Sequence, residues 1–220
     1  MVKEKRSPFE IAYEEAFSLA CKEFLQKDVY SCCINAGAEV FKHSEYSFNI
    51  KINFLNRPVN INIPEFTFSL ESPDNIDIWG KILILHYLSN SDETPLTNSL
   101  INYKQVKSGS NYFPTFEKRS IKPLISSFGK EPHLLIESSK QLGGEEVSYG
   151  DFGVKITAFP FVPIFLIIWK GDEEFPATGN ILFDSSIEKR LSAEDIAVLC
   201  QQIVFKIIKN KTDEGAKLNK

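Results

Sequence analysis

An acidic segment in the last third of the chain holds the densest set of residues that could do chemistry. Asp172, Glu173 and Glu174 follow an apolar run that ends at Trp169, and Asp184 closes the next apolar segment. Carboxylates that converge could hold a hard divalent cation or act as acid and base, because proximity raises one of their pKa values. The alternative is a turn whose acids face water, and it is favoured because no histidine is near in the sequence.

The three histidines lie in separate segments, at His43, His86 and His133. They show no HxH, HExxH or HxxxH spacing, so the sequence holds no local metal motif and we predict no metal ligands. His86 falls on or beside the apolar face of a predicted helix that also carries Trp79. It is a candidate ligand-binding residue, and a buried imidazole satisfied by a hydrogen bond is the alternative.

The cysteine spacing argues against an iron–sulfur or zinc site. Cys32 and Cys33 are adjacent, whereas Cys21 and Cys200 are far apart, so no CxxC pair is present. The adjacent pair could be redox-active, but it lies in a stretch of small apolar residues where buried cysteines act as small hydrophobes. We expect free thiols that pack in the core.

Two glycine loops could bring backbone close to an anion, at residues 108–111 (Ser-Gly-Ser-Asn) and 142–144 (Leu-Gly-Gly). The first could open a helix whose free N–H groups favour a phosphate or carboxylate. Neither loop fits the P-loop or the dinucleotide-binding pattern, so plain turns are favoured.

The elements that must position these residues begin with a helix and a hairpin. Ser7 and Pro8 predict the start of a helix whose apolar residues continue to Phe24. Alternation over residues 48–63 predicts a β-hairpin, and a short strand over 66–70 extends it.

Helices are predicted for the middle of the chain. Asp74 or Asn75 is expected to cap a mostly buried helix that continues to about residue 88. Residues 112–128 predict two short helices interrupted by prolines, and 133–142 predict another that ends at two glycines.

Three strands, over 154–158, 164–169 and 179–183, precede a C-terminal helix that Ser192 and Asp195 begin with a capping box. Strands in two blocks, separated by helices, favour an α+β class: antiparallel strands packed against amphipathic helices at both ends of the chain. We expect one domain over residues 1–210 and a charged flexible tail over 211–220.

Composition restricts the partners. The 220 residues carry a net charge of −4, which gives no general attraction to nucleic acid or anionic lipid. No apolar segment follows the basic N-terminal residues, so we expect a cytoplasmic protein. The longest apolar run, residues 159–169, is shorter than the roughly 20 residues of a membrane-spanning helix.

Several motifs together resemble an uncharacterised prokaryotic family known only as a domain of unknown function. They are the segments 83–88 (Leu-Ile-Leu-His-Tyr-Leu), 159–163 (Phe-Pro-Phe-Val-Pro), 169–177, 182–184 and 194–195. The resemblance spans most of the chain. It implies an origin in anaerobic bacteria or archaea, relatives with an added iron–sulfur domain that this chain lacks, and an accessory role near corrinoid, iron–sulfur or one-carbon metabolism. It supplies no catalytic residues.

Two hypotheses follow. The first is a binding module that holds a small molecule or docks a redox or corrinoid protein partner, without a cofactor that the sequence identifies. Its candidate ligand-binding residues are Trp79, His86, Tyr112, Trp169, Asp172, Glu173, Glu174 and Asp184. The alternative is an acid-cluster enzyme, in which Asp172, Glu173 or Asp184 binds a divalent metal or transfers a proton with His86.

The edge of the N-terminal hairpin could also form a homodimer, unless the first helix covers it.

Overall fold

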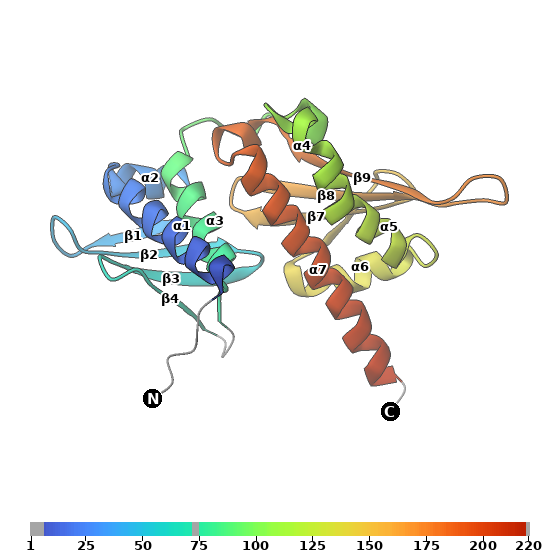
Figure 1. Cartoon of the computed structure of the whole chain (residues 1–220), viewed down its shortest axis with the longest axis horizontal. Coiled ribbons are helices and arrows are strands. Elements are labelled where there is room, and N and C mark those ends of the chain that lie inside the picture. Colours follow the sequence, from blue (N-terminus) through green and yellow to red (C-terminus); the bar gives the residue numbers. More distant parts are fainter. Residues whose placement is uncertain (1–6, 72–74, 219–220) are drawn as a thin grey trace. The chain divides into compact units, whose positions relative to one another are not determined.

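The computed structural model describes the backbone of residues 7–71 and 75–218 and the side chains as far as residue 211. It confirms the α+β class, with a four-stranded and a five-stranded antiparallel sheet and helices near both ends of the chain (Figure 1). The chain divides into two compact units. Unit 1 comprises residues 1–52 and 58–93, and unit 2 comprises residues 53–57 and 94–220. Whether each unit folds alone is a separate question, so the single-domain expectation stays a prediction.

Unit 1 contains a meander of four strands in the order β1-β2-β3-β4. The strands are β1 (Glu39–Lys42), β2 (Phe48–Phe54), β3 (Arg57–Ile63) and β4 (Thr67–Leu70). The apolar residues of β2 and β3 are buried and the intervening asparagines are more exposed, as the alternation predicted. The predicted hairpin and the strand that extends it are therefore confirmed.

The helices of unit 1 are α1 (Pro8–Leu25), α2 (Val29–Asn35) and α3 (Ile78–Asn90). Ser7 and Glu10 form a reciprocal capping box at the start of α1, which confirms its predicted beginning. The cap of α3 is Asp77, which accepts a hydrogen bond from the Gly80 N–H, so the expected cap at Asn75 is wrong. Asp74 lies outside the described residues. Asp77 is the cap because it immediately precedes the first helical residue, where its side chain can accept a hydrogen bond from the first turn.

The tip of the β2–β3 hairpin belongs to unit 2. Leu55 and Asn56 both have positive φ angles, as a tight two-residue hairpin turn requires. The Leu55 N–H donates to the Ala158 carbonyl at 2.9 Å, and Phe54 stacks on Phe159 with ring centroids 4.9 Å apart. The turn is thus part of the core of unit 2.

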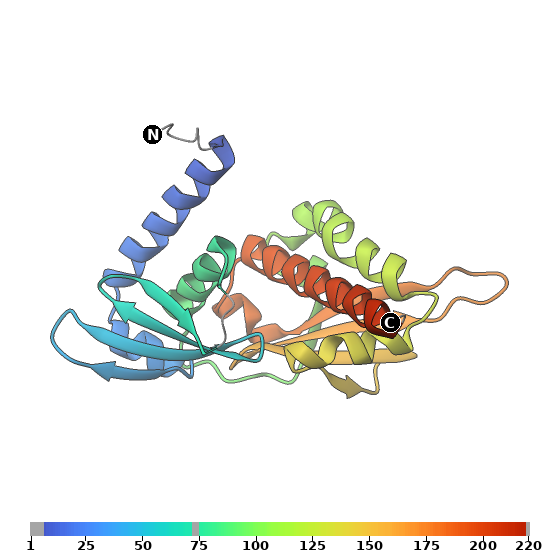
Figure 2. The ribbon, with the colours of Figure 1, turned by 90° about the horizontal axis from the view of Figure 1, so that it is seen from below.

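The sheet of unit 2 has the order β5-β9-β8-β7-β6. Its strands are β5 (Leu100–Asn102), β6 (Glu145–Val147), β7 (Phe152–Phe159), β8 (Val162–Trp169) and β9 (Thr178–Asp184). The core-facing side chains of the three long strands are fully buried: Val154, Ile156, Ile164, Leu166, Ile181 and Phe183. Figure 2 shows α4, α5 and α7 on the same side of this sheet.

The helices of unit 2 are α4 (Gly109–Phe116), a π-helical turn (Glu117–Ile121), α5 (Lys122–Phe128), α6 (His133–Ser139) and α7 (Ala193–Leu218), with 3₁₀ turns at Tyr103–Gln105, Lys140–Leu142 and Ser185–Lys189. The two short helices expected over residues 112–128 are present as α4 and α5, although helical turns continue between them without a gap. The π-helical turn changes the hydrogen-bond register just before Pro123, where a missing N–H is tolerated.

Helix α7 continues through most of the segment that we expected to be a tail. Along the described part of the chain, no helix combines the length and apolar content that a membrane crossing requires.

Gly109 is predicted to be essential for the loop that leads into α4. A Cβ atom at this position would overlap the Tyr103 carbonyl oxygen, which is backbone and cannot move freely. We expect Gly109→Ala to reduce the free energy of unfolding by about 2 kcal/mol or more, measured by urea denaturation. Thr115→Ala, at an exposed position of the same helix, should change it little; equal losses in both variants would contradict the close approach.

Candidate functional site

The acidic segment 172–174 forms the exposed tip of the β8–β9 hairpin. The Asp172 carboxylate accepts hydrogen bonds from the N–H groups of Glu174 and Phe175, at 2.9 and 2.7 Å. These bonds, the one from Phe175 first, lower the pKa of Asp172 below its ordinary value. Glu173 and Glu174 face solvent. The favoured turn interpretation therefore describes this segment.

Asp184 lies at the opposite end of β9 from this tip. Thr178 and Asp184, the two ends of β9, are six positions apart along the strand, a rise of roughly 20 Å at 3.3 Å per residue. Asp172 and Asp184 therefore cannot ligate one metal ion or share a proton in this fold. Among the described residues, no group of three histidine, cysteine or acidic side chains is placed to hold a metal.

Asp184 itself is buried and fixes the backbone around it. Its carboxylate accepts hydrogen bonds from the N–H groups of Thr97, Asn98 and Ser186 and from the Thr97 hydroxyl, at 2.6 to 3.1 Å. Burial alone would raise the pKa of Asp184, but the hydrogen bonds from Ser186 and Thr97 outweigh it, and the pKa lies below its ordinary value.

The aromatic candidates are dispersed. Trp79 and His86 lie on α3 in unit 1, where Trp79 contacts Tyr13 with ring centroids 3.8 Å apart. Trp169 ends β8 and is 40% exposed. Tyr112 lies on α4 and is the one candidate that lines the pocket described below.

All four cysteines are free thiols; Cys33 and Cys200 are buried, whereas Cys21 and Cys32 are half-buried. Burial raises the pKa of Cys33 to about 12 and that of Cys21 to about 11, and it also raises the pKa of Cys32. A raised pKa keeps a thiol neutral and slows its oxidation and metal binding. These values favour the core interpretation of Cys32 and Cys33 over a redox pair.

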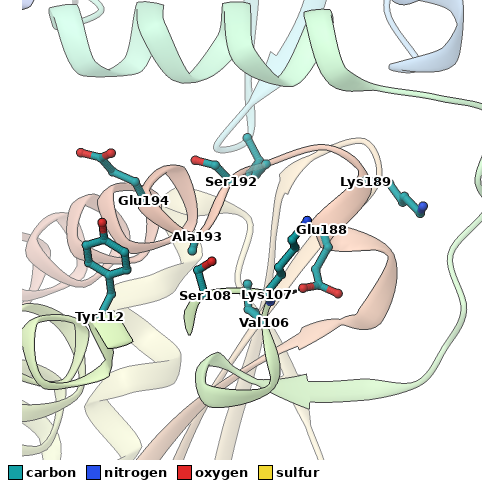
Figure 3. Close-up of a pocket in the computed structure, with 10 residues that line it drawn as sticks. Val106, Lys107, Ser108, Tyr112, Glu188, Lys189, Ser192, Ala193 and Glu194 are labelled. Atoms are coloured by element: carbon teal, nitrogen blue, oxygen red, sulfur yellow. Dashed lines mark hydrogen bonds between the residues drawn. The ribbon is translucent and has the colours of Figure 1, made fainter. Parts of the chain in front are cut away.

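Unit 2 contains a pocket of about 550 Å³ at the start of α7. Val106 and Leu191 are its buried apolar members. The polar members come from two segments far apart in the sequence: Lys107, Ser108 and Tyr112 from the loop and helix α4, and Glu188, Lys189, Ser192 and Glu194 from the chain that enters α7. Figure 3 shows the two segments facing each other across the pocket.

Tyr103 joins these two segments beneath the pocket. Its hydroxyl donates to the Ala193 carbonyl at 2.7 Å, and its ring stacks on Phe116 with centroids 4.0 Å apart. Burial, then the nearby Cys200, Tyr112 and Glu194, raise the pKa of Tyr103 to about 12. The phenol therefore stays protonated and keeps its hydrogen bond at physiological pH.

The loop 106–108 is held from both sides. Its Lys107 N–H donates to the Glu188 carboxylate, and the Gly109 N–H donates to the Val106 carbonyl at 2.8 Å. Across the pocket, Ser192 and Asp195 form the predicted reciprocal capping box at the start of α7. The pocket walls are thus preorganised by hydrogen bonds.

Sequence reasoning missed Arg190, which lies between two pocket residues and is 1% exposed. Its guanidinium donates to the carbonyls of Ser186 and Thr94 and lies 5.2 Å from the centroid of the Phe161 ring. It missed Lys107, Ser192 and Glu194 as site residues as well. The only indication of this pocket in the sequence was the Ser-Gly-Ser-Asn loop that precedes Tyr112.

One family model, described as a domain of unknown function (DUF3786), matches residues 28–206. The chain belongs to this family. No curated protein and no solved structure matches the chain significantly. The matched region includes every residue that lines the pocket, whereas α1 precedes it.

Asp184 is predicted to stabilise this DUF3786 domain in a pH-dependent way. Asp184→Asn should reduce the free energy of unfolding by about 2–4 kcal/mol at pH 7, because an amide cannot accept all of these hydrogen bonds. A lowered folded-state pKa contributes stability above the unfolded value near 3.9, and that stability is lost as the pH falls through the folded value.

The difference between wild type and Asp184→Asn, measured by urea denaturation, should therefore be complete at pH 7 and shrink only below about pH 4. Asp172→Asn is the matched control, because its side-chain oxygen can still accept the turn hydrogen bonds. A difference independent of pH down to pH 2 would contradict a charge effect.

Proposed function

We propose that this domain binds a small polar molecule in the pocket between Lys107 and Tyr112. The pocket itself carries the proposal: its volume of about 550 Å³ falls within the 300–1,000 Å³ typical of small-molecule sites. Its buried apolar residues offer contact area, and hydroxyl, phenol, ammonium and carboxylate groups surround them.

The architecture supports a binding role. Tyr103, the Ser192–Asp195 capping box and the Lys107–Glu188 hydrogen bond hold both walls in place before any ligand arrives. Preorganised walls reduce the entropy lost on binding. The acid-cluster enzyme has less support, since Asp172 and Asp184 lie at opposite ends of β9.

A pocket-filling variant tests this function. We expect saturation-transfer NMR against a panel of amino acids, nucleosides, sugar phosphates and short-chain acids to reveal binders, and Ala193→Phe to abolish their signals by occupying the pocket. Ala12→Phe, at an exposed position of α1 in unit 1, is the matched control and should bind normally. Circular dichroism would verify that both variants fold. Absence of any binder, or equal binding by Ala193→Phe, would refute the proposal.

A second candidate function is protein docking through the β8–β9 hairpin. Phe175 is 66% exposed at its tip, where the Asp172 turn holds the backbone. An exposed aromatic side chain on a preorganised turn is typical of an interface anchor. Three carboxylates precede it, so we propose a partner with a basic surface and an apolar socket. The family resemblance implies that this partner is a redox or corrinoid protein.

Site-specific cross-linking in the source organism tests this docking. A photo-reactive phenylalanine analogue in place of Phe175 should cross-link one protein that the same analogue in place of the exposed Tyr46 does not. That protein, purified, should bind the wild-type chain and bind about tenfold more weakly to Glu173→Lys/Glu174→Lys. Identical cross-links at both positions, or unchanged affinity, would argue against the hairpin as an interface.

A further inference from the structure

The polar groups around the pocket fall on two sides of different chemistry. Figure 3 shows Tyr112 and Glu194 on one side and Lys107 and Glu188 on the other, with Ser108 between them. The first side offers an aromatic ring and a carboxylate, which together attract an ammonium group. The second offers an ammonium, with the Ser108 hydroxyl as a neighbouring donor.

Glu188 also lies on the second side, where it adds a carboxylate to the ammonium and hydroxyl groups. Its carboxylate already accepts the Lys107 N–H, so one of its oxygens holds the loop. The first turn of α4 adds positive potential here, because no side chain caps it and Ser108, which precedes it, lines the pocket. This side can therefore bind an acid group through Lys107, Ser108 and the start of α4.

From this division we infer that the ligand is a small zwitterion, with an ammonium group toward Tyr112 and Glu194 and a carboxylate toward Lys107 and Ser108. The inference rests on the proposed function, since it names the ligand class of the same pocket. A molecule with only an ammonium group or only a carboxylate would engage one side of the pocket alone.

A homologous series of probes tests the ligand class. The probes are ω-amino acids from glycine to 6-aminohexanoate, with butanoate and butylamine as singly charged comparisons, titrated by calorimetry into the full chain. We expect one chain length to bind best, and at least about tenfold more tightly than either singly charged probe. Raising the salt from 50 to 500 mM should weaken binding, because the charged groups are exposed.

Two variants test which side of the pocket binds each charged end of the probe. Glu194→Gln should weaken the best ω-amino acid about tenfold and leave butanoate unchanged, whereas Lys107→Met should weaken it equally and leave butylamine unchanged. Lys118→Met is the matched control, since this exposed lysine of unit 2 does not line the pocket, whereas Lys189, which does line it, points away from the other side chains in Figure 3. The control should bind like wild type.

The outcomes separate this inference from the proposed function. If panel compounds bind and Ala193→Phe abolishes their binding, but no ω-amino acid exceeds the singly charged probes, the pocket is a binding site and the zwitterion is wrong. If Lys107→Met and Lys118→Met weaken binding equally, a general charge effect replaces the assigned contact. If nothing binds, both proposals fail.

Discussion

The buried carboxylate of Asp184 sets the course of the chain around the pocket. It ends β9, accepts the N–H of Ser186 at the start of the turn that follows, and holds Thr97 and Asn98 on the incoming segment. A buried carboxylate is costly to desolvate, and several hydrogen bonds must compensate for that cost. Because those donors come from segments far apart in the sequence, the compensation fixes both segments together. Residues 188–194 then emerge from a fixed point into the pocket wall.

Tyr103 performs the corresponding task for the opposite wall. Its hydroxyl reaches the first residue of α7, and its ring lies flat on Phe116 of α4, so one side chain ties the loop, α4 and α7 together. The overlap that a Cβ atom on Gly109 would create with the Tyr103 carbonyl shows how closely the loop follows this residue. The backbone that carries side chains such as Lys107 at the pocket rim is already ordered. It therefore loses little further entropy when a ligand binds.

The elements that sequence reasoning identified are those with local signals. The sequence predicts the caps at Ser7 and Ser192 and the alternation of β2, β3 and β7, because each of these features depends on residues within a few positions of one another. Helix α2 and the short strands β1, β5 and β6 were missed. Their lengths span too few residues for a period to show, and β5 exists only because it pairs with the distant end of β9.

The candidate site was less predictable for the same reason. Tyr112 was selected for its aromatic ring; it lines the pocket, and its role in binding stays a prediction. Lys107 and Glu194 are exposed charged residues, and such residues usually give no indication of a functional site in the sequence. They line the same pocket only because β5 pairs with β9 and Tyr103 bonds to Ala193. Asp184 was selected as a reactive carboxylate, but its hydrogen bonds make it a structural one.

The buried charge of Arg190 likewise holds a segment of backbone in place, namely the segment with which the chain enters unit 2. A guanidinium is costly to bury, and within the described residues no carboxylate pairs with it. Two carbonyl oxygens and the face of Phe161 solvate it instead. One of those carbonyls belongs to Thr94, the first residue of this segment in unit 2. Arg190 therefore fixes the entry point, and Asp184 fixes the chain three residues later. The two buried charges hold the same short segment, and the chain between them carries Glu188 and Lys189 of the pocket wall, so this part of the wall is constrained at both ends.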